Sequence, residues 1–210
     1  MRSYVRRERN HPSVIAWSIG NEMPDQSSIE GGATGKELQD IARQEDGTRQ
    51  STAGLNNAKP NATLADVLEI IGLNYQGEGK GTSWTSIYPD FHSKFPNKMI
   101  WGTETASTVS SRGTYLFPVT KEKTAIVGDA GSENNATHYV SSYELYHPSW
   151  AASPDKVFEM QDKYEYVAGE FVWTGWVGIP RRQIRGVFWR WKNYFRLRKS
   201  HLSIRPILLT

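Results

Sequence analysis

The chain has 210 residues, enough to bury one sizeable hydrophobic core. It contains no Cys, which excludes disulfides and thiolate metal sites, and no apolar run long enough to span a membrane. The net charge of +3 is unevenly distributed, because residues 171–210 carry 9 Lys and Arg and no acid, whereas residues 1–170 carry all 22 acids. The amino end lacks the apolar stretch of a signal peptide, so the sequence assigns no compartment.

Apolar runs alternate with helical patterns along most of the chain. Helices are expected at residues 4–9, 36–44, 63–69 and 87–95, and from 153 onward. Five runs have the composition of strands buried on both faces and end in polar tips, at residues 14–19, 49–53, 69–75, 98–104 and 166–173. The helix at residues 63–69 has a candidate cap at Asn61 or Thr63. Strands alternating with helices predict an α/β fold with a parallel sheet.

The first and fourth of these strands each end in a glycine and an acid. Val-Ile-Ala-Trp-Ser-Ile-Gly-Asn precedes Glu22, and Lys-Met-Ile-Trp-Gly-Thr precedes Glu104. A carboxylate beside a buried strand costs desolvation, so its position requires a chemical reason. The two acids are 82 residues apart, which holds about three strand–helix units of roughly 27 residues each. In a barrel of such units, both acids lie on the face where active sites occur.

Paired carboxylates facing one cleft are the groups that glycoside hydrolysis requires. One acid protonates the leaving oxygen, and the other attacks the anomeric carbon or activates water. The aromatic content of 12% suits the same chemistry, because an indole face packs on the C–H face of a sugar. Ordinary core packing is the alternative for these aromatic residues, and an ion pair or a surface position is the alternative for each acid.

Three segments of the chain resemble glycoside hydrolase family 2, the group of β-galactosidases, β-glucuronidases and β-mannosidases. Residues 7–22 (Arg-Glu-Arg-Asn-His-Pro-Ser-Val-Ile-Ala-Trp-Ser-Ile-Gly-Asn-Glu) resemble its acid/base segment. Residues 101–107 (Trp-Gly-Thr-Glu-Thr-Ala-Ser) resemble the nucleophile segment of the β-galactosidase branch, and residues 169–176 (Gly-Glu-Phe-Val-Trp-Thr-Gly-Trp) resemble the last barrel strand. The likeness runs over about residues 4–176 and implies a partial TIM (β/α)8 barrel, roughly strands 4 to 8 with their helices.

The resemblance implies a retaining hydrolase of terminal β-D-galactosides, with Glu22 as acid/base and Glu104 as nucleophile. Asn21 would contact the sugar 2-hydroxyl, Tyr75 would reach the nucleophile, and Trp173 would stack on the sugar. Their alternatives are a turn residue, barrel packing and core packing, respectively. Carbohydrate is the expected partner, and oligomerisation is an option for a full-length parent. No metal ligand set is readable, although Mg²⁺ or Na⁺ occurs in parts of the family.

Two stretches depart from the strand–helix pattern. Residues 108–152 form a long polar insertion, expected on the active-site face where it would shape substrate access. The resemblance stops after Trp176, so residues 177–210 are interpreted as a basic non-homologous tail, from a shift of reading frame or as a natural extension. Because the resemblance omits the first three barrel strands and the flanking domains, the chain is interpreted as a fragment with two unpaired sheet edges.

Three alternatives remain open at this stage. An inert truncated fragment or pseudoenzyme would keep the site residues without turnover. A β-glucuronidase is the rival enzyme. That branch binds the sugar carboxylate with an Asn-x-Lys motif beyond the last strand, whereas the matching Asn57-Ala-Lys59 follows an earlier strand and is not assigned this role. A β-mannosidase is less similar around the nucleophile. Arginines interleaved with aromatic residues in the tail would allow nucleic-acid binding, which the other features do not favour, and no membrane association is expected.

Overall fold

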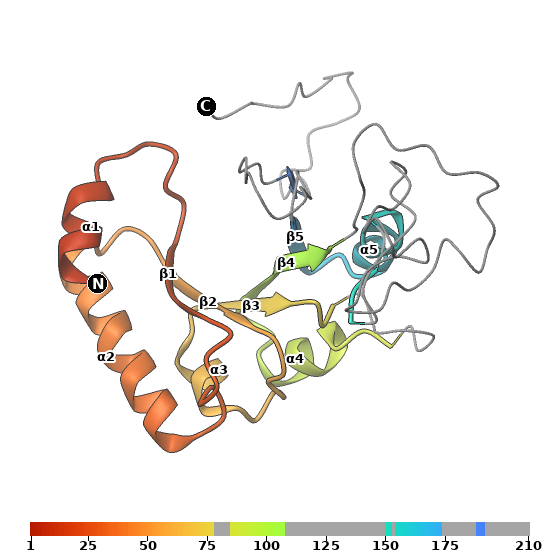
Figure 1. Ribbon diagram of the computed structural model, residues 1–210, viewed down its shortest axis with the longest axis horizontal. Helices are drawn as coiled ribbons and strands as arrows, with labels where there is room; N and C mark the ends of the chain where they lie inside the picture. The colour runs from red at the N-terminus through yellow and green to blue at the C-terminus, as the bar shows by residue number, and fades with distance from the viewer. Residues whose placement is uncertain (78–84, 108–149, 153, 174–187, 192–210) are drawn as a thin grey trace, which may run out of the picture.

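The computed structural model of this chain describes residues 1–77, 85–107, 150–152, 154–173 and 188–191 (Figure 1). One sheet of six strands runs through these residues, and its strands are arranged in the order of the sequence. Strands β1 to β5 pair in parallel with their neighbours, and β6 pairs antiparallel with β5. The strands are β1 (Trp17–Asn21), β2 (Ser51–Leu55), β3 (Ile70–Asn74), β4 (Met99–Ala106), β5 (Val167–Trp173) and β6 (Phe188–Trp191).

Helices alternate with the parallel strands along the chain. They are α1 (Arg2–Glu8), α2 (Ile29–Glu45), α3 (Thr63–Val67), α4 (Tyr88–Lys94) and α5 (Pro154–Asp162). In Figure 1 the helices lie around the row of strands, from α1 and α2 at the left, past α3 and α4, to α5 at the right. A parallel sheet with helices between successive strands is the partial (β/α)8 barrel that the sequence predicted.

Helix α2 is longer than the helix predicted over residues 36–44. It begins after Ser28, whose side-chain oxygen accepts a hydrogen bond of 3.0 Å from the backbone of the first turn. The sequence does not predict the amino-terminal half of α2, because that half contains glycines, which disfavour helix interiors. At Gly35 the absence of a side chain has a packing reason, since a Cβ there would lie 2.3 Å from Leu64 Cδ1. These glycines let α2 pack closely against α3.

The cap expected for α3 at Asn61 or Thr63 is wrong. The residue before the helix is Ala62, which offers no side-chain hydrogen bond. The Thr63 hydroxyl donates instead to the backbone oxygen of Ser28, the residue that caps α2. Thr63 therefore joins the starts of two helices rather than closing its own, a tertiary contact that local sequence does not reveal.

Strand β5, expected at the edge of the sheet, has a further neighbour. Strand β6 pairs with β5 over four residue pairs, from Gly169 opposite Trp191 to Val172 opposite Phe188. Its residues belong to the stretch that was interpreted as a non-homologous tail. The sequence analysis assigned no strand here because the family resemblance stops after Trp176. Among the described strands, β1 and β6 each have a neighbour on one side alone, so the sheet has two edges, as expected.

The hydrophobic core lies between the central strands and the helices. Every residue of β2 and of β3 is buried, as expected for parallel strands covered on both faces. Leu55, Leu73 and Ile100 from the strands pack in one cluster with Leu64 and Phe91 from the helices. This packing fixes the strands relative to one another, and therefore fixes the side chains at their carboxyl ends.

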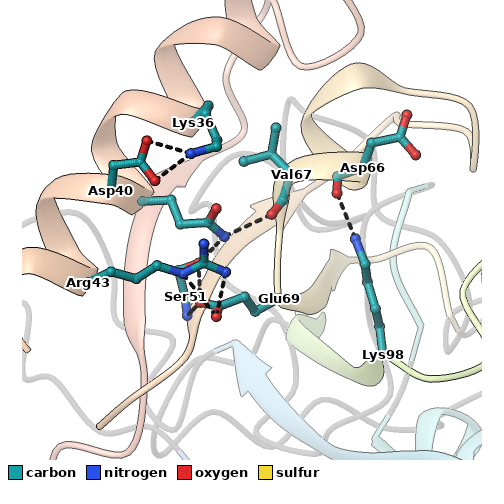
Figure 2. Close-up of polar contacts among 9 residues, drawn as sticks. Lys36, Asp40, Arg43, Ser51, Asp66, Val67, Glu69 and Lys98 are labelled. Carbon is teal, nitrogen blue, oxygen red and sulfur yellow. Dashed lines mark hydrogen bonds and ion pairs between the residues drawn. The ribbon is translucent and has the colours of Figure 1, made fainter. Parts of the chain in front are cut away.

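At the amino-terminal end of the central strands, polar contacts connect the strands to the helices (Figure 2). Glu69, just before β3, accepts hydrogen bonds from the Ser51 backbone at 2.8 Å and from the Arg43 guanidinium of α2 at 2.8 Å. Burial raises the pKa of Glu69, but these donors outweigh burial and lower it overall. Lys98 Nζ donates to the backbone oxygen of Asp66 at 2.8 Å, which satisfies a carbonyl at the end of α3.

Asp46, which follows α2, is the most strongly held carboxylate of this end. Its side chain accepts hydrogen bonds from Trp17 Nε1 at 3.0 Å and from Arg49 at 2.6 Å, and the Thr48 backbone adds one at 2.9 Å. Burial alone would raise the pKa of Asp46, but these donors lower it well below its ordinary value. A lowered pKa contributes stability above the unfolded value of about 3.9, and this contribution is lost as pH falls through the folded value.

We expect Asp46→Asn to lower the free energy of unfolding by about 3 kcal/mol at pH 7, because it leaves Arg49 without its buried partner. The difference from the parent should shrink as pH falls below about 4. Urea unfolding at several pH values measures both effects. Asp40→Asn on α2 is the control, since Asp40 pairs at the surface with Lys36 and its loss should cost less than about 0.5 kcal/mol. Equal losses in the two variants would contradict the assignment.

Candidate active site

Three parallel strands end in strained backbone at the same edge of the sheet. Glu22 follows β1 with a φ of 47°, Tyr75 follows β3 with a φ of 55°, and Ala106 ends β4 with a φ of 69°. Non-glycine residues seldom adopt this left-handed region, and those that do cluster at functional sites. Backbone hydrogen bonds hold the geometry, since the Glu22 nitrogen donates to Gly54 O and the Tyr75 nitrogen donates to Glu104 O, each at 2.8 Å.

The side chains at this edge enclose a cavity of about 460 Å³. Its walls include all five residues that the sequence proposed for the site, together with two that it did not. The lining residues are Asn21, Glu22, Asn56, Tyr75, Glu104, Trp150 and Trp173. Residues more than 150 positions apart in the sequence therefore meet in one space. The two carboxylates face the same cavity.

Asn74, the last residue of β3, links the two acid-bearing strands. Its Nδ2 donates to Glu22 Oε1 at 2.9 Å and to Asn21 Oδ1 at 3.0 Å. The Thr103 hydroxyl donates to Asn74 Oδ1 at 2.6 Å, which fixes the orientation of the amide. Asn74 is fully buried, so the amide is held rigidly beneath the cavity. The sequence analysis missed Asn74 because a polar residue at the end of a strand resembles an ordinary turn residue.

Glu104 is half-buried, and hydrogen-bond donors partly offset the effect of burial on its pKa. Burial raises its pKa, hydrogen bonds from Tyr75, Asn21 and Asn74 lower it, and the charge of Glu22 raises it again. The net effect is a pKa above the ordinary value. The charge of Glu22 is one of the causes that raise the pKa of Glu104, so the two carboxyl groups interact across the cavity.

Tyr75 connects the carboxylate pair to an aromatic wall. Its hydroxyl donates to Glu104 Oε2 at 3.0 Å. Burial and the charge of Glu104 raise the pKa of Tyr75, so the hydroxyl stays a proton donor at every physiological pH. The ring of Trp150 packs edge-on against Tyr75 with centroids 4.8 Å apart. Trp150 and Trp173 are 39% and 46% exposed, so each presents an indole surface to the cavity.

Two glycines provide the space that this arrangement needs. A Cβ on Gly54, at the end of β2, would lie 2.3 Å from Asn21 Oδ1 and 2.7 Å from Asn74 Oδ1. A Cβ on Gly102 in β4 would lie 1.7 Å from a carboxylate oxygen of Glu170, a buried residue of β5. Any larger residue at either position would displace these polar side chains. A glycine within a buried strand can indicate that a neighbouring side chain approaches the backbone closely, so these two glycines were a usable signal in the sequence.

The site residues that sequence reasoning missed came from stretches with weak patterns. Trp150 belongs to the insertion over residues 108–152, whose other residues up to 149 lie outside the described part of the chain. Asn56 follows β2 and reads as part of a loop. Among the described residues, no group of three or more His, Cys, Asp or Glu side chains could hold a metal ion. The same residues contain no helix long and apolar enough to cross a membrane.

Comparison with known proteins gives one family match. Residues 1–114 match the model described as glycosyl hydrolases family 2, TIM barrel domain. The beta-galactosidase BoGH2A of Bacteroides ovatus is 27% identical over 215 residues, which cover 86% of this chain and 24% of that protein. A protein of Formosa agariphila with the provisional name beta-glucuronidase is 27% identical over 194 residues, which cover 83% of this chain and 16% of that protein.

A solved structure shows the same fold. The crystal structure of a glycosyl hydrolase family 2 member from Bacteroides cellulosilyticus aligns with a TM-score of 0.53 and 22% identity, over 82% of this chain and 17% of that one. This chain therefore spans about a quarter or less of the length of each of these relatives.

We expect Glu104→Gln to raise the free energy of unfolding at pH 7 by less than about 1 kcal/mol, since Glu104 is half-exposed. A carboxyl with a raised pKa binds its proton more tightly in the folded state, so its stability contribution is present at low pH and lost as pH rises. Gln keeps the Tyr75 hydrogen bond and removes the buried charge. The gain should vanish below about pH 4, where the unfolded carboxyl is also protonated.

Thermal unfolding at pH 7 and pH 3 measures this effect, since about 1 kcal/mol shifts Tm by roughly 2–4 °C in a chain of this size. Glu37→Gln is the control, because Glu37 is exposed on α2. A variant that is less stable than the parent at pH 7 would show that Glu104 is held mainly by its donors.

Proposed function

Because this chain belongs to glycosyl hydrolase family 2, we propose that it hydrolyses terminal β-D-galactosides with retention, using Glu22 as acid/base and Glu104 as nucleophile. The observation that carries the proposal is the placement of both carboxylates in one cavity, where Asn74 donates a hydrogen bond to Glu22 and pairs in register with Glu104. The family acts on carbohydrate. The choice of sugar and the activity of this chain are the proposed parts.

The first step forms a covalent intermediate. Protonated Glu22 gives its proton to the glycosidic oxygen, the bond from that oxygen to the anomeric carbon breaks, and Glu104 attacks the anomeric carbon from the opposite face. The leaving alcohol takes the proton, and the sugar stays esterified to Glu104. Retention requires carboxyl groups roughly 5–5.5 Å apart. The hydrogen bond from Asn74 to Glu22 and the pairing of Asn74 with Glu104 in register support a close spacing.

The second step hydrolyses this ester. Ionised Glu22 removes a proton from water as the water oxygen attacks the anomeric carbon, and Glu104 leaves as a carboxylate. Two inversions leave the sugar in its original β configuration. Glu22 is protonated again at the end, so the cycle closes without another group.

Coupling between the two acids supports these roles. The charge of Glu22 raises the pKa of Glu104, so protonating Glu22 removes that repulsion and favours ionised Glu104. Donors from Tyr75, Asn21 and Asn74 then stabilise the nucleophile. The state with one proton on the pair is therefore the state that the first step needs.

Two further residues are assigned to sugar binding. The oxygen of the Asn21 amide accepts from Asn74, so its nitrogen is directed toward Glu104 and the sugar 2-hydroxyl. Trp173, at the end of β5, offers an exposed indole on which a sugar ring stacks. Both residues line the same cavity as the acids.

A neutral galactoside is preferred to an anionic sugar for two reasons. The segment around Glu104 resembles the β-galactosidase branch, and the relative named beta-galactosidase aligns over 86% of this chain. Glucuronide hydrolysis is the second candidate, because a relative of equal identity carries the provisional name beta-glucuronidase.

We expect the purified chain to release p-nitrophenol from p-nitrophenyl β-D-galactoside faster than from the β-D-glucuronide. Glu104→Gln should lower kcat/KM more than about 10³-fold, because no nucleophile remains. Glu22→Gln should lower kcat/KM by about 10²–10⁴-fold, because general acid–base assistance is lost. Proton NMR should show the β anomer as the first product.

Glu37→Gln, a change of the same kind on the surface of α2, is the control and should keep the parent rate. Release no faster from the parent than from Glu104→Gln would identify an inert chain that keeps the site residues without turnover. A faster rate on the glucuronide would support the second candidate instead.

A further inference from the structure

We propose that Asn56 is a further substrate-binding residue, whose side-chain amide donates a hydrogen bond to a neutral oxygen of the bound glycoside, and that Gln26 is its positioning residue. This inference rests on the proposed function, because it takes a glycoside as the ligand of the cavity. Asn56 follows β2, is half-buried and lines the cavity together with Glu22 and Glu104.

Gln26 determines which end of the Asn56 amide faces the cavity. Gln26 Nε2 donates to the backbone oxygen of Met23 at 2.9 Å and to Asn56 Oδ1 at 2.9 Å. A backbone oxygen can only accept, so the nitrogen of Gln26 must lie at this position. Asn56 consequently turns its oxygen toward Gln26 and leaves its Nδ2 as the group available to a ligand. Within the described residues, the Asn56 side chain makes one recorded hydrogen bond, the one from Gln26.

The burial of Gln26 indicates that its amide serves more than packing. Its side chain is 1% exposed, and its Oε1 has no hydrogen-bond partner among the described residues. An unsatisfied buried carbonyl costs stability, and an apolar side chain of the same length would fill the space without that cost. What Gln26 supplies in return is the pair of donated bonds that fixes Asn56 relative to Met23, the residue next to Glu22.

The backbone before Asn56 is fixed from the other side. Gln76, just beyond β3, is buried and donates from Nε2 to the backbone oxygen of Leu55 at 2.8 Å. Two glutamines, one after β1 and one after β3, thus hold the end of β2 between the acid-bearing strands. Rigid support of this kind is what a binding group needs, because it lowers the ordering cost on ligand binding.

The chemistry of an amide donor selects the ligand atom. Glu22 and Glu104 are acceptors when ionised, so they bind hydroxyl protons of a sugar. Asn56 complements them by donating to an oxygen lone pair, as a sugar hydroxyl or ring oxygen offers. The group is neutral, so it adds no charge to the coupled acid pair.

Binding of methyl 1-thio-β-D-galactoside, which resists hydrolysis, tests the assignment without turnover. We expect Asn56→Ala to weaken binding about tenfold by isothermal titration calorimetry, the effect of one lost hydrogen bond. Asn56→Asp retains the oxygen that accepts from Gln26 but replaces the donor by a charged acceptor, so it should bind at least as weakly. Asn57→Ala is the matched control, since Asn57 is exposed and lies outside the cavity lining, and should bind within twofold of the parent.

Monodeoxy analogues of the same thioglycoside identify the acceptor. The parent should bind one analogue about tenfold more weakly than the intact sugar. Asn56→Ala should bind that analogue and the intact sugar equally well. Such non-additivity is the sign of a direct contact between Asn56 and the missing hydroxyl. Gln26→Leu should also weaken binding, and combining it with Asn56→Ala should add little. Thermal unfolding of each variant shows whether the fold is kept; Asn56→Asp is the variant that changes the fewest contacts.

The two proposals fail separately. Parent-like affinity in Asn56→Ala and Asn56→Asp, or fully additive losses with every deoxy sugar, would overturn the role of Asn56 and leave the hydrolase proposal intact. Binding that depends on Asn56 in a chain whose hydrolysis is absent or insensitive to Glu104→Gln would overturn the hydrolase proposal alone. Absence of binding by the parent would overturn the role of Asn56.

Discussion

The amide of Asn74 between two carboxylates is the interaction on which the site depends. Glu22 and Glu104 would separate if they met without donors, because like charges in a partly buried cavity repel. Asn74 lowers that repulsion by donating to Glu22 and to the neighbouring amide, while Thr103 fixes its orientation. The parallel pairing of β3 with β4 brings Asn74 beside Glu104 in register. A sheet with another strand order would not place this amide between the acids.

Carboxylates with lowered and with raised pKa values lie at opposite ends of the same strands. At the amino-terminal end, carboxylates such as Asp46 and Glu69 are surrounded by donors, and their pKa values are lowered. At the carboxyl end, the pKa of Glu104 is raised despite its donors, so the folded chain bears a cost there. This division is the one expected for a (β/α)8 barrel, in which the amino-terminal face maintains the fold and the opposite face carries the reaction. The buried central strands join the two ends.

Sequence reasoning succeeded where one local pattern determined the outcome. Buried parallel strands read as short apolar runs, so all five parallel strands were found within a few residues, and Glu22 and Glu104 stood out as acids at their ends. It failed where tertiary contacts decided. The glycines of α2 oppose helix formation locally and are explained by contact with α3. Asn74 and Asn56 look like turn residues until the strands are adjacent, and β6 depends on pairing with β5.

The donors around the acid pair are neutral, and this has a mechanistic consequence. Among the described lining residues, those other than the two acids carry no charge: they are Asn21, Asn56, Tyr75, Trp150 and Trp173. A lysine or arginine in their place would hold both carboxylates ionised, and an ionised acid cannot protonate a leaving oxygen. Neutral donors stabilise one negative charge without preventing protonation of the other acid. Under the proposed double displacement, one acid gives a proton to the leaving oxygen and later takes one from water, which neutral donors permit.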